Sequence, residues 1–338
     1  MTGAALPRDQ EQQLTLLQAN LAKVETRLAA ATAAADPLVA DAAGHLLRAG
    51  GKRLRPSLVL LAADLGNGCN DAVLDAAAVV ELTHAASLYH DDVMDAAPLR
   101  RGAPSAHTRY GNTIAILTGD LLFAKASSIV AGLGPECVLI QAETFARLCQ
   151  GQIRETAGPR DGEDPIEHHL GVLRDKTASL IAASAHLGAL LGGCPPSTVQ
   201  AAVRFGEKIG LAFQLADDII DLTSNQAASG KTPGTDLREH IPTLPVLLLQ
   251  AEAEADKAAG RTASAAITLA DTLQGDLSDP AALSDAVARL AAHHATAQAR
   301  ATATTWAEAA IRELSGLPQS PPVQSLISLA HQSTTRLA

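Results

Sequence analysis

The stretch ELTHAASLYHDDVMD, residues 81–95, joins an apolar helical run to a cluster of aspartates. Residues four apart share one face of a helix, so Asp91 and Asp95 are expected to point the same way, about one turn apart. The same DDxxD spacing returns in QLADDIID, residues 214–221. The carboxylates are Asp91, Asp92 and Asp95 in the first stretch, and Asp217, Asp218 and Asp221 in the second. Both stretches are therefore predicted to be helices that carry acidic clusters.

The composition favours helix along the whole chain. The 338 residues are 47% apolar but include only four Phe, two Tyr and one Trp, so Ala, Leu, Val and Ile must build the core. Alanine and leucine favour helix, whereas β-branched and aromatic residues at alternating positions are scarce. Turn clusters rather than a linker separate the helical runs, and Pro165 and Pro196 are placed to begin helices. We predict an all-α fold with one domain over residues 1–338.

Charge and cysteine usage exclude several classes of protein. A net charge of −10 and few aromatic side chains argue against nucleic-acid binding. Four scattered cysteines fit neither a zinc site nor a disulfide framework, which indicates a reducing, cytoplasmic setting. The N-terminal residues show no signal-peptide pattern, and the most membrane-like window, residues 178–194, is predicted to be a buried core helix. We expect a soluble cytoplasmic protein without a membrane span.

The two acidic clusters lie between apolar residues, so neither has the character of a solvated acidic face. Carboxylates held there without cations would repel one another and shift their pKa values. Oxygen ligands without His or Cys suit Mg²⁺, which takes one or two carboxylates together with waters and substrate phosphates. A single DDxxD could equally be a solvated helix end or an N-cap cluster. Two copies, each with an apolar approach, favour a metal site.

Basic residues accompany the acidic clusters. The stretch GGKRLRP, residues 50–56, places three cations and two glycines before an apolar helix that is expected to begin near Ser57. Glycines let the backbone approach an anion, and helix N-termini favour phosphate. Further candidates are Arg100, Arg101, Lys176 and Lys231. Any one of these could be a solvated surface charge, but together they predict a diphosphate site, for which arginine offers a bidentate grip.

The motifs resemble the trans-type polyprenyl diphosphate synthases, in particular the long-chain type that makes hepta-, octa- and nonaprenyl diphosphates. The matching segments run in family order and belong to a motif-bearing core over about residues 40–250. They are GGKRLRP (50–56), ELTHAASLYHDDVMDAAPLRRGAPSAHTRYGN (81–112), GDLLFAKA (119–126), GQIRE (151–155), KTASL (176–180) and FQLADDIIDLTSNQAASGKTPGTDLREHIPTLPV (213–246). The resemblance implies the isoprenoid synthase type I fold, a bundle of long antiparallel helices around a central cavity, in a homodimer.

The resemblance also implies the reaction and the roles of single residues. Isopentenyl diphosphate would condense head to tail (1'-4) with an allylic prenyl diphosphate by ionisation, condensation and elimination. Three Mg²⁺ ions, for which Mn²⁺ can substitute, would be held by the six aspartates against the allylic diphosphate. Isopentenyl diphosphate would be bound by Lys52, Arg55, His84 and Arg101. The allylic substrate would be contacted by Arg100, Lys176, Thr177, Gln214 and Lys231, of which Arg100, Lys176 and Lys231 also count as catalytic.

Three of these assignments have a plainer alternative. His84 could be a buried histidine satisfied on a helix face, Gln214 a helix-surface amide, and Thr177 a helix N-terminal residue. The long irregular stretch Thr223–Pro242, which carries Lys231, is expected to act as a lid. His240 stands in this stretch where the family usually has glycine, which leaves the local loop geometry open.

The helix before Asp91 carries the prediction of product length. Residues four, five and eight before Asp91 line its wall progressively deeper, and they are Ser87, Ala86 and Thr83. Short-chain members of the family carry large side chains at these positions. The resemblance therefore implies a product of about seven to ten isoprene units, roughly C35–C50, which would extend along this helix at about 1.5 Å per residue. Small residues could also stand there by chance in an alanine-rich chain. Phe123 and Phe145 are candidate floors of this pocket or ordinary core residues.

Other functions stay open. A short- or medium-chain synthase, making farnesyl or geranylgeranyl diphosphate, would share the same motifs. A terpene cyclase would need an aromatic-lined cavity to steer cations, and it lacks the second diphosphate site that GGKRLRP predicts. A non-catalytic partner subunit would have lost the aspartates. The preferred primer, and whether product release needs contact with a membrane, are not decided by the sequence.

Overall fold

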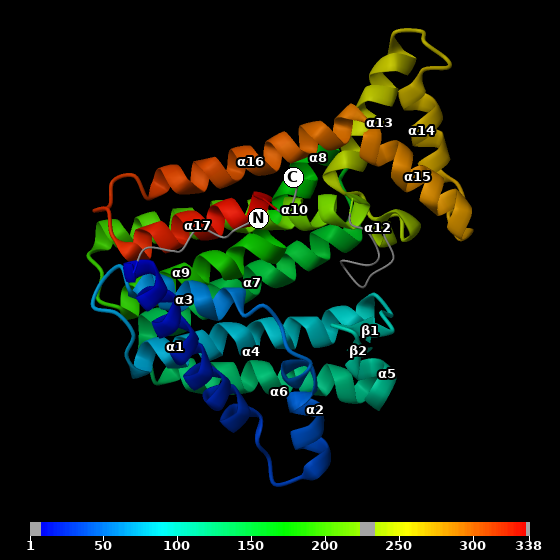
Figure 1. The fold of residues 1–338 in the computed structure, drawn as a ribbon. Helices are drawn as coiled ribbons and strands as arrows, with labels where there is room; N and C mark the ends of the chain where they lie inside the picture. Colours follow the sequence, from blue (N-terminus) through cyan, green and yellow to red (C-terminus); the bar gives the residue numbers. More distant parts are fainter. Residues whose placement is uncertain (1–7, 224–233, 336–338) are drawn as a thin grey trace. The chain divides into compact units, whose positions relative to one another are not determined.

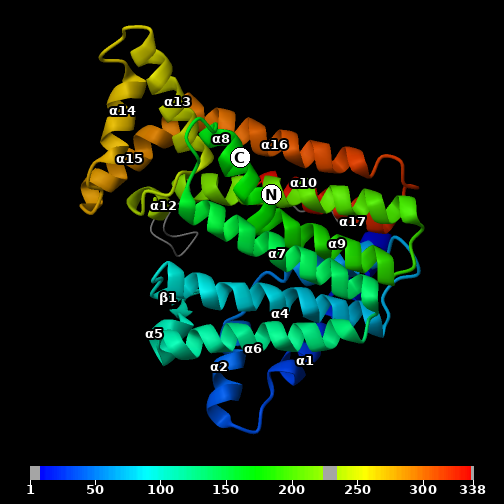
Figure 2. The same ribbon diagram turned by 180° about the vertical axis from the view of Figure 1, so that it is seen from behind.

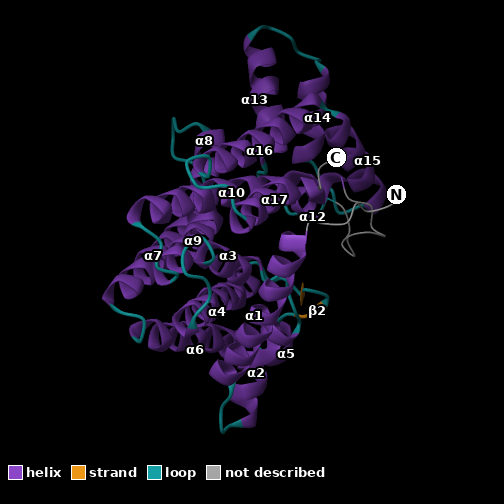
Figure 3. Cartoon of the chain, turned by 60° about the vertical axis from the view of Figure 1, so that its left-hand side comes forward, coloured by secondary structure: helices purple, strands orange, loops and turns teal. Residues whose placement is uncertain are grey.

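The computed structural model describes residues 8–223 and 234–335 and is helical nearly throughout (Figure 3). This confirms the predicted all-α class. The prediction missed a small antiparallel hairpin of β1 (Leu99–Arg100) and β2 (Ala103–Pro104). Arg101 and Gly102, with φ of +54° and +77°, form the two-residue turn between the strands, as hairpins of this kind require. Strands this short leave no periodic signal in a sequence.

The helices group into two compact units, each described here by itself. Unit 1 comprises Met1–Leu148, Ser179–Gly206 and Glu313–Ser328. Its helices are α1 (Arg8–Thr32), α2 (Pro37–Arg48), α3 (Leu54–Ala63), α4 (Asp71–Met94), α5 (Ala106–Tyr110), α6 (Asn112–Ala131) and α9 (Ser179–Leu191), with the first parts of α7 (Pro135–Ala157), α10 (Pro196–Thr223) and α17 (Pro321–Thr335).

Unit 2 comprises Cys149–Ala178, Glu207–Arg312 and Leu329–Ala338. Besides the second parts of α7, α10 and α17, its elements are α8 (Pro165–Leu173), the π-helical turn η1 (Arg174–Ala178), α12 (Thr235–Arg238), α13 (Leu244–Ala258), α14 (Ala265–Gln274), α15 (Pro280–Ala292) and α16 (His294–Glu313). That residues 1–338 act as one domain stays a prediction.

Capping residues and prolines begin several of these helices. Asp36 accepts hydrogen bonds from two backbone N–H groups of α2, at 2.8 and 3.2 Å, and Pro37 takes the first helical position. Asp164 and Pro165 begin α8 in the same way, and α10 begins at Pro196. Proline suits this position because its missing N–H would have no partner within the helix. Both proline starts predicted from the sequence are confirmed.

α4 is the central element of unit 1. It contacts α1, α3, α6 and α9, and it runs alongside α6 in two opposite views (Figures 1 and 2). Ala76, Ala77 and Ala78 are consecutive and fully buried. Because successive residues are about 100° apart around a helix, three in a row show that α4 is enclosed on most sides. This buried helix carries the first acidic cluster at its C-terminal end.

α10 has the corresponding place in one core cluster of unit 2. Leu211, Leu215 and Ile219 on α10 are buried there against residues of α8, α13 and α16. Trp306, the single tryptophan of the chain, lies on α16 and packs half-buried against this cluster. The second acidic cluster therefore also stands on a helix that is anchored by apolar side chains.

α3 begins at Leu54, earlier than the start predicted near Ser57. Arg53 takes the N-cap position with φ of +47°, so the helical residues follow directly after it. Pro56 is accommodated in the first turn because the N–H it lacks is not needed there. Arg55 consequently lies on the helix itself and not in the preceding loop.

Within the part of the chain that the structure describes, two helices are long and apolar enough to cross a membrane by length and composition alone. In Asp71–Met94, 72% of the apolar window is buried, as in the core helix of a folded protein, whereas in Asn112–Ala131 only 33% is buried. The window predicted to be a buried core helix, residues 178–194, contains α9, most of whose residues are buried.

His240 follows α12 in a left-handed conformation, with φ of +54°. Its N–H donates to the Leu237 carbonyl oxygen at 3.1 Å, which closes the end of the helix. Glycine commonly takes such positions after a helix. Histidine in place of the family's usual glycine therefore strains the backbone, because His240 adopts a left-handed conformation that glycine would adopt at a lower free-energy cost.

Replacing His240 with glycine is expected to raise the free energy of unfolding by about 0.5–1 kcal/mol. The left-handed region costs an L-residue about 1–2 kcal/mol, and the greater freedom of glycine in the unfolded chain removes part of that gain. Thermal and urea unfolding measure the change. Glu239→Gly is the matched control, since Glu239 has φ of −89° and glycine there is expected to destabilise. If His240→Gly is less stable than the wild type, the backbone at His240 is not strained.

Candidate active site

The first acidic cluster lies at the C-terminal end of α4. Asp92 is fully buried, Asp91 is half-buried and Asp95 is exposed. The helix ends at Met94, and Asp95 takes the C-cap position with φ of −87° and ψ of −2°. Because these dihedrals are still close to helical, Asp91 and Asp95 keep the one-turn spacing predicted from the sequence.

Asp92 is held by an arginine of the hairpin. The Nε and Nη2 atoms of Arg100 lie 2.7 and 2.6 Å from Oδ1 of Asp92. The other oxygen, Oδ2, is buried and has no hydrogen-bond partner. Burial raises the pKa of Asp92, although the positive charge of Arg100 lowers it. A buried carboxylate oxygen without a partner is costly, and a divalent cation is a group that would satisfy it.

Arg101 joins the hairpin to the GGKRLRP segment. Its Nη1 donates to the Leu46 carbonyl oxygen at 3.1 Å and to the carbonyl oxygen of Gly50. At Gly51, with φ of +153°, an added Cβ would lie 2.9 Å from Cζ of the Arg101 guanidinium. Only glycine lets the backbone pass this close. Gly51, one of the two glycines that the sequence assigned to an anion, makes room in the structure for an arginine, whereas a Cβ at Gly50 would meet no atom within 4 Å.

Arg55 and His84 form the inner part of the same basic group. The Nε of Arg55 is buried without a hydrogen-bond partner, and burial lowers the pKa of Arg55 to about 10. Burial, together with the charges of Arg55 and Arg101, holds the pKa of His84 well below its usual range. His84 is therefore a neutral imidazole that can donate one hydrogen bond. Lys52 lies exposed on the same segment.

The second acidic cluster is linked to the KTASL segment within unit 2. Nε2 of Gln214 donates to Oδ1 of Asp218 at 3.0 Å, and Oγ1 of Thr177 donates to Oε1 of Gln214 at 3.2 Å. Oδ2 of Asp218 is buried without a hydrogen-bond partner, as is one oxygen of Asp92. Each acidic cluster thus has one aspartate with an oxygen held by a side chain and an oxygen that lacks a partner.

Asp221 lies near the end of α10 and accepts hydrogen bonds from two residues that follow later in the chain. Its Oδ2 accepts a hydrogen bond from the Asp236 N–H at 3.2 Å, and its carbonyl oxygen accepts one from the Gly234 N–H at 3.0 Å. Asp217 and Asp221 are both half-buried. Lys231 lies outside the described residues, so its assignment and that of the lid stay predictions.

Lys176 lies on η1, one of the rare π-helical turns that often mark functional sites. It forms an ion pair with Glu155 of the GQIRE segment. Gly151, in the same segment, permits the contact between α7 and η1, because a Cβ there would lie 2.5 Å from the Lys176 backbone nitrogen. The two motifs are thus adjacent in unit 2.

A family model described as polyprenyl synthetase matches residues 36–273 of the chain. The chain belongs to the polyprenyl synthetase family. The chain is 42% identical over 321 residues to the nonaprenyl diphosphate synthase of Mycobacterium tuberculosis, across 95% of this chain and 93% of that protein. As a member of the family it is a prenyltransferase.

Solved structures agree with this family. A decaprenyl diphosphate synthase from Rhodobacter capsulatus is similar with a TM-score of 0.85 and 32% identity, covering 97% of this chain and 99% of that one. A geranylgeranyl pyrophosphate synthase from Corynebacterium glutamicum, complexed with calcium and isoprenyl diphosphate, has a TM-score of 0.84 and 38% identity, covering 97% and 98%. The chain therefore has the isoprenoid synthase fold.

The positions predicted to control product length differ in burial. Thr83 and Ala86 are buried, whereas Ser87 is half-buried. Thr83 and Ser87 donate their hydroxyl groups to carbonyl oxygens of their own helix, at 2.8 and 2.9 Å, so neither presents an unpaired donor to an apolar chain. Whether these residues line a product pocket in the polyprenyl synthetase stays a prediction.

The two candidate floor residues of the polyprenyl synthetase lie against each other. The rings of Phe123 on α6 and Phe145 on α7 have centroids 4.1 Å apart, and Phe145 is 36% exposed. Their contact joins α6 to α7 in unit 1. Their role as a floor is not tested by this contact.

Two buried or half-buried residues that contact the motif residues, Glu81 and His169, were missed by the sequence analysis. Glu81 is 2% exposed and accepts a hydrogen bond from Nη1 of Arg53 at 2.7 Å, and Arg53 also pairs with Glu25. His169 has its Nε2 3.7 Å from Oδ2 of Asp218, and neither atom has a hydrogen-bond partner. A buried acid within an apolar helical run was the available signal for Glu81, whereas no local pattern marks His169.

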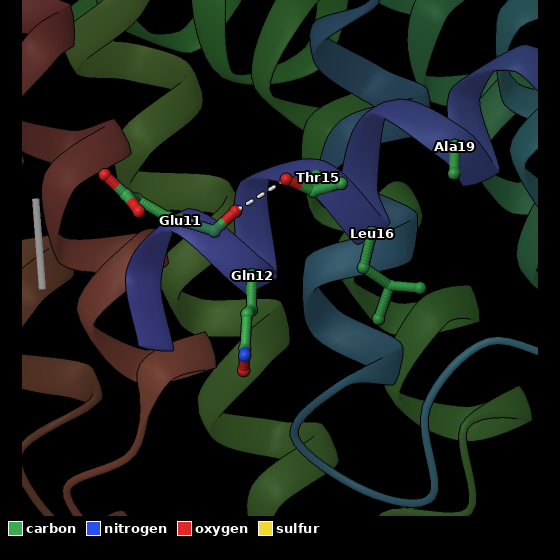
Figure 4. A pocket seen from close by; sticks show the side chains of 5 residues that line it. All are labelled: Glu11, Gln12, Thr15, Leu16 and Ala19. Carbon is green, nitrogen blue, oxygen red and sulfur yellow. Dashed lines mark hydrogen bonds between the residues drawn. The ribbon is translucent and has the colours of Figure 1, made fainter. Parts of the chain in front are cut away.

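An open hollow on α1 involves none of the predicted site residues. It is lined by Glu11, Gln12, Thr15, Leu16 and Ala19, all on α1 (Figure 4). Oγ1 of Thr15 donates to the carbonyl oxygen of Glu11 at 2.8 Å, within the helix itself. The hollow has neither paired carboxylates nor a cation among its lining residues, so it does not compete with the acidic clusters as an active site of the polyprenyl synthetase.

Proposed function

We propose that the protein condenses isopentenyl diphosphate head to tail with an allylic prenyl diphosphate to give a long all-trans polyprenyl diphosphate. The observation that carries the proposal is the pair of buried aspartates, Asp92 and Asp218. Each stands in a DDxxD motif, has one oxygen held by a side chain, and has a second, buried oxygen without a hydrogen-bond partner. The assigned metal ligands are Asp91, Asp92, Asp95, Asp217, Asp218 and Asp221.

Each of the two aspartate clusters fits a hard divalent cation, Mg²⁺ or its substitute Mn²⁺. All the ligands are carboxylate oxygens, and the two unpartnered buried oxygens are atoms that a cation would satisfy. The related geranylgeranyl pyrophosphate synthase from Corynebacterium glutamicum has calcium and isoprenyl diphosphate in its structure. When bound, the cation supplies Lewis-acid stabilisation of the charge on a departing diphosphate.

Isopentenyl diphosphate is assigned to the basic group of unit 1, namely Lys52, Arg55, His84 and Arg101. Arg55 brings a buried Nε that lacks a partner, and His84 is neutral and can donate to a phosphate oxygen. Arg101 is held by two backbone carbonyls, so its guanidinium is ordered before any ligand arrives. Preorganised donors lose little freedom when an anion binds.

The allylic diphosphate is assigned to Arg100, Lys176, Thr177, Gln214 and Lys231. Within this group, Thr177 and Gln214 form a relay that orients Asp218, so part of their contribution passes through that carboxylate. Arg100 and Lys176 contribute positive charge where the C1–O bond of the allylic substrate breaks. A new bond then forms between the allylic C1 and the isopentenyl C4, and a proton is lost to the departing diphosphate.

A long product, of about seven to ten isoprene units, is favoured by the absence of bulk at Thr83, Ala86 and Ser87 along a wall that rises about 1.5 Å per residue. The nonaprenyl and decaprenyl diphosphate synthases among the relatives support the same length. A short-chain synthase is the competing assignment, because a geranylgeranyl pyrophosphate synthase is comparably similar in structure.

The direct test is incubation of the purified protein with Mg²⁺, labelled isopentenyl diphosphate and either farnesyl or geranylgeranyl diphosphate, followed by sizing of the dephosphorylated products. Products that extend to roughly 35 carbons or more are expected if the wall before Asp91 stays open, and the Asp91→Ala variant should lose them. Products that end at about 15 or 20 carbons would support the proposed reaction but refute the proposed long product. If no label is incorporated, the proposed condensation is refuted.

We also propose that the protein is a homodimer that pairs through α6 and α7 of unit 1. Both helices expose large apolar side chains. Within one chain, the contact between Phe123 and Phe145 holds α6 beside α7. Exposed apolar patches of this kind mark association surfaces. The exposed residues, with fractions from 36% to 59%, are Ile116, Leu117, Val138, Leu139 and Phe145.

A charge in this patch is expected to separate the dimer. Leu139→Asp should elute as a monomer in size-exclusion chromatography with light scattering, because an unpaired carboxylate buried at an apolar interface is strongly unfavourable. Leu38→Asp is the matched control, since Leu38 is also 52% exposed but lies on α2, and it should remain dimeric. A dimer that survives Leu139→Asp would place the interface elsewhere.

A further inference from the structure

We propose that Glu252, His293 and His294 form a binding site for a late first-row divalent metal ion such as Zn²⁺, separate from the residues assigned to prenyl transfer. The three side chains come from α13 and from the junction between α15 and α16, all in unit 2 (Figure 1). One ligand atom of each lies within 4.8 Å of the others. No other cluster of three such side chains meets this distance within residues 8–223 and 234–335.

The distances suit ligands of one ion. Nε2 of His294 lies 2.9 Å, and Nε2 of His293 3.9 Å, from Oε2 of Glu252. Zinc bonds of about 2.0–2.2 Å to nitrogen and oxygen put neighbouring ligand atoms of a tetrahedral site about 3.3–3.5 Å apart. The two observed distances lie on either side of this separation, so rotations of the side chains suffice to seat an ion.

Glu252 provides a second, independent observation. Its Oε2 is buried and has no hydrogen-bond partner, although Nε2 of His294 is only 2.9 Å away. The contact has the distance of an ion pair but lacks hydrogen-bond geometry, so the carboxylate oxygen is available to a cation. A cation between them would satisfy the buried oxygen, whose lack of a hydrogen bond otherwise costs free energy.

The histidines are suited to act as ligands. Their ring centroids are 4.4 Å apart, and burial together with His294 lowers the pKa of His293, so that ring keeps a free electron pair near neutral pH. Nδ1 of His293 accepts a long hydrogen bond, 3.3 Å, from the Ala295 N–H. Binding through Nε2 moves the ring proton to Nδ1 and breaks this bond, so His293 is the weakest of the three ligands.

The ligand set selects the class of metal. Two imidazoles and one carboxylate without a thiolate suit Zn²⁺, Co²⁺ and Ni²⁺ better than Mg²⁺, which prefers oxygen alone. An ion there would connect α13 to the start of α16 and close the chain segment that contains α14 and α15. Such a link restricts the unfolded chain and stabilises these outer helices.

The test uses the full chain, freed of metal with a chelator and then supplied with excess Mg²⁺. Zinc titrated by calorimetry is expected to bind at one site per chain. His294→Ala should weaken this binding at least about tenfold, and His293→Ala should weaken it less, because removing even an indirect partner of a metal site costs about 10–100-fold. Co²⁺ bound to the wild type should show the visible absorption bands of a low-coordinate site, which His294→Ala should lack.

Two controls separate the site from other metal binding. His331→Ala removes an exposed histidine on α17 and should leave the zinc affinity unchanged. Prenyl transfer with Mg²⁺ should be the same in His294→Ala and the wild type, which shows that the variant is folded. Equal zinc affinities of His294→Ala and the wild type, or loss of zinc binding in excess Mg²⁺, would overturn the proposal.

Discussion

Asp92→Asn is expected to lower the rate of prenyl transfer about 10³-fold, since removing one preorganised electrostatic group from an active site costs about 10²–10³-fold and the variant would also lose a proposed metal ligand. The asparagine keeps the shape of the side chain. It removes the negative charge that pairs with Arg100 and one of the two carboxylate oxygens proposed to bind a cation. Single-turnover kinetics with labelled isopentenyl diphosphate measure the chemical step directly.

Asp75→Asn is the matched control for this variant. Asp75 lies on the same helix and also pairs with an arginine, since Nε of Arg27 donates to its Oδ1 at 2.7 Å. Asp75 lies near the N-terminal end of α4, far from the aspartates at the C-terminal end. Its loss should therefore leave the rate near that of the wild type. Circular dichroism of both variants checks that they are folded. An Asp92→Asn enzyme within tenfold of the wild type would contradict the role of this carboxylate.

Ser87→Phe is expected to shift the product from roughly C35–C50 to about C15–C20, because a ring one turn before Asp91 would block a growing chain near the start of the wall. Ser87 is half-buried, so a larger side chain disturbs packing less there than at the fully buried Ala86. Chromatography of the dephosphorylated products measures the shift, and total incorporation should fall much less than the mean chain length.

Leu88→Phe tests whether the effect belongs to one face of α4. The neighbouring position is also half-buried, but it lies about 100° around the helix from Ser87. Its product length is expected to match the wild type. If both variants shorten the product equally, the cause is a general distortion of the helix. If neither does, Ser87 does not line the path of the chain.

The sequence predicted the features that repeat within a helix. The DDxxD spacing, the proline starts of α8 and α10 and the all-α class all follow from local periodicity, and local patterns survive in the folded structure. The basic group also proved coherent, because the pKa of His84 responds to the charges of Arg55 and Arg101. The structure thus brings three of the predicted residues close together, and their binding of a diphosphate stays a prediction.

Contacts between distant segments could not be predicted in this way. The ion pair of Arg53 with Glu25 and Glu81 joins three separate segments, and the hairpin that presents Arg100 to Asp92 is too short to leave a pattern. The left-handed backbone at Arg53 and Arg101 was also hidden, since both are charged residues in positions where glycine is expected. These features depend on what lies opposite in space.

The scarcity of aromatic side chains has a spectroscopic consequence. Trp306 is the only tryptophan, and it packs half-buried against a core cluster of unit 2 that includes Leu215 and Ile219 of α10. Tryptophan emission therefore reports the local environment of unit 2 alone, whereas far-ultraviolet circular dichroism reports the helices of both units. If the two signals lose intensity at different denaturant concentrations, the units unfold separately, and coincident transitions indicate a single cooperative unit.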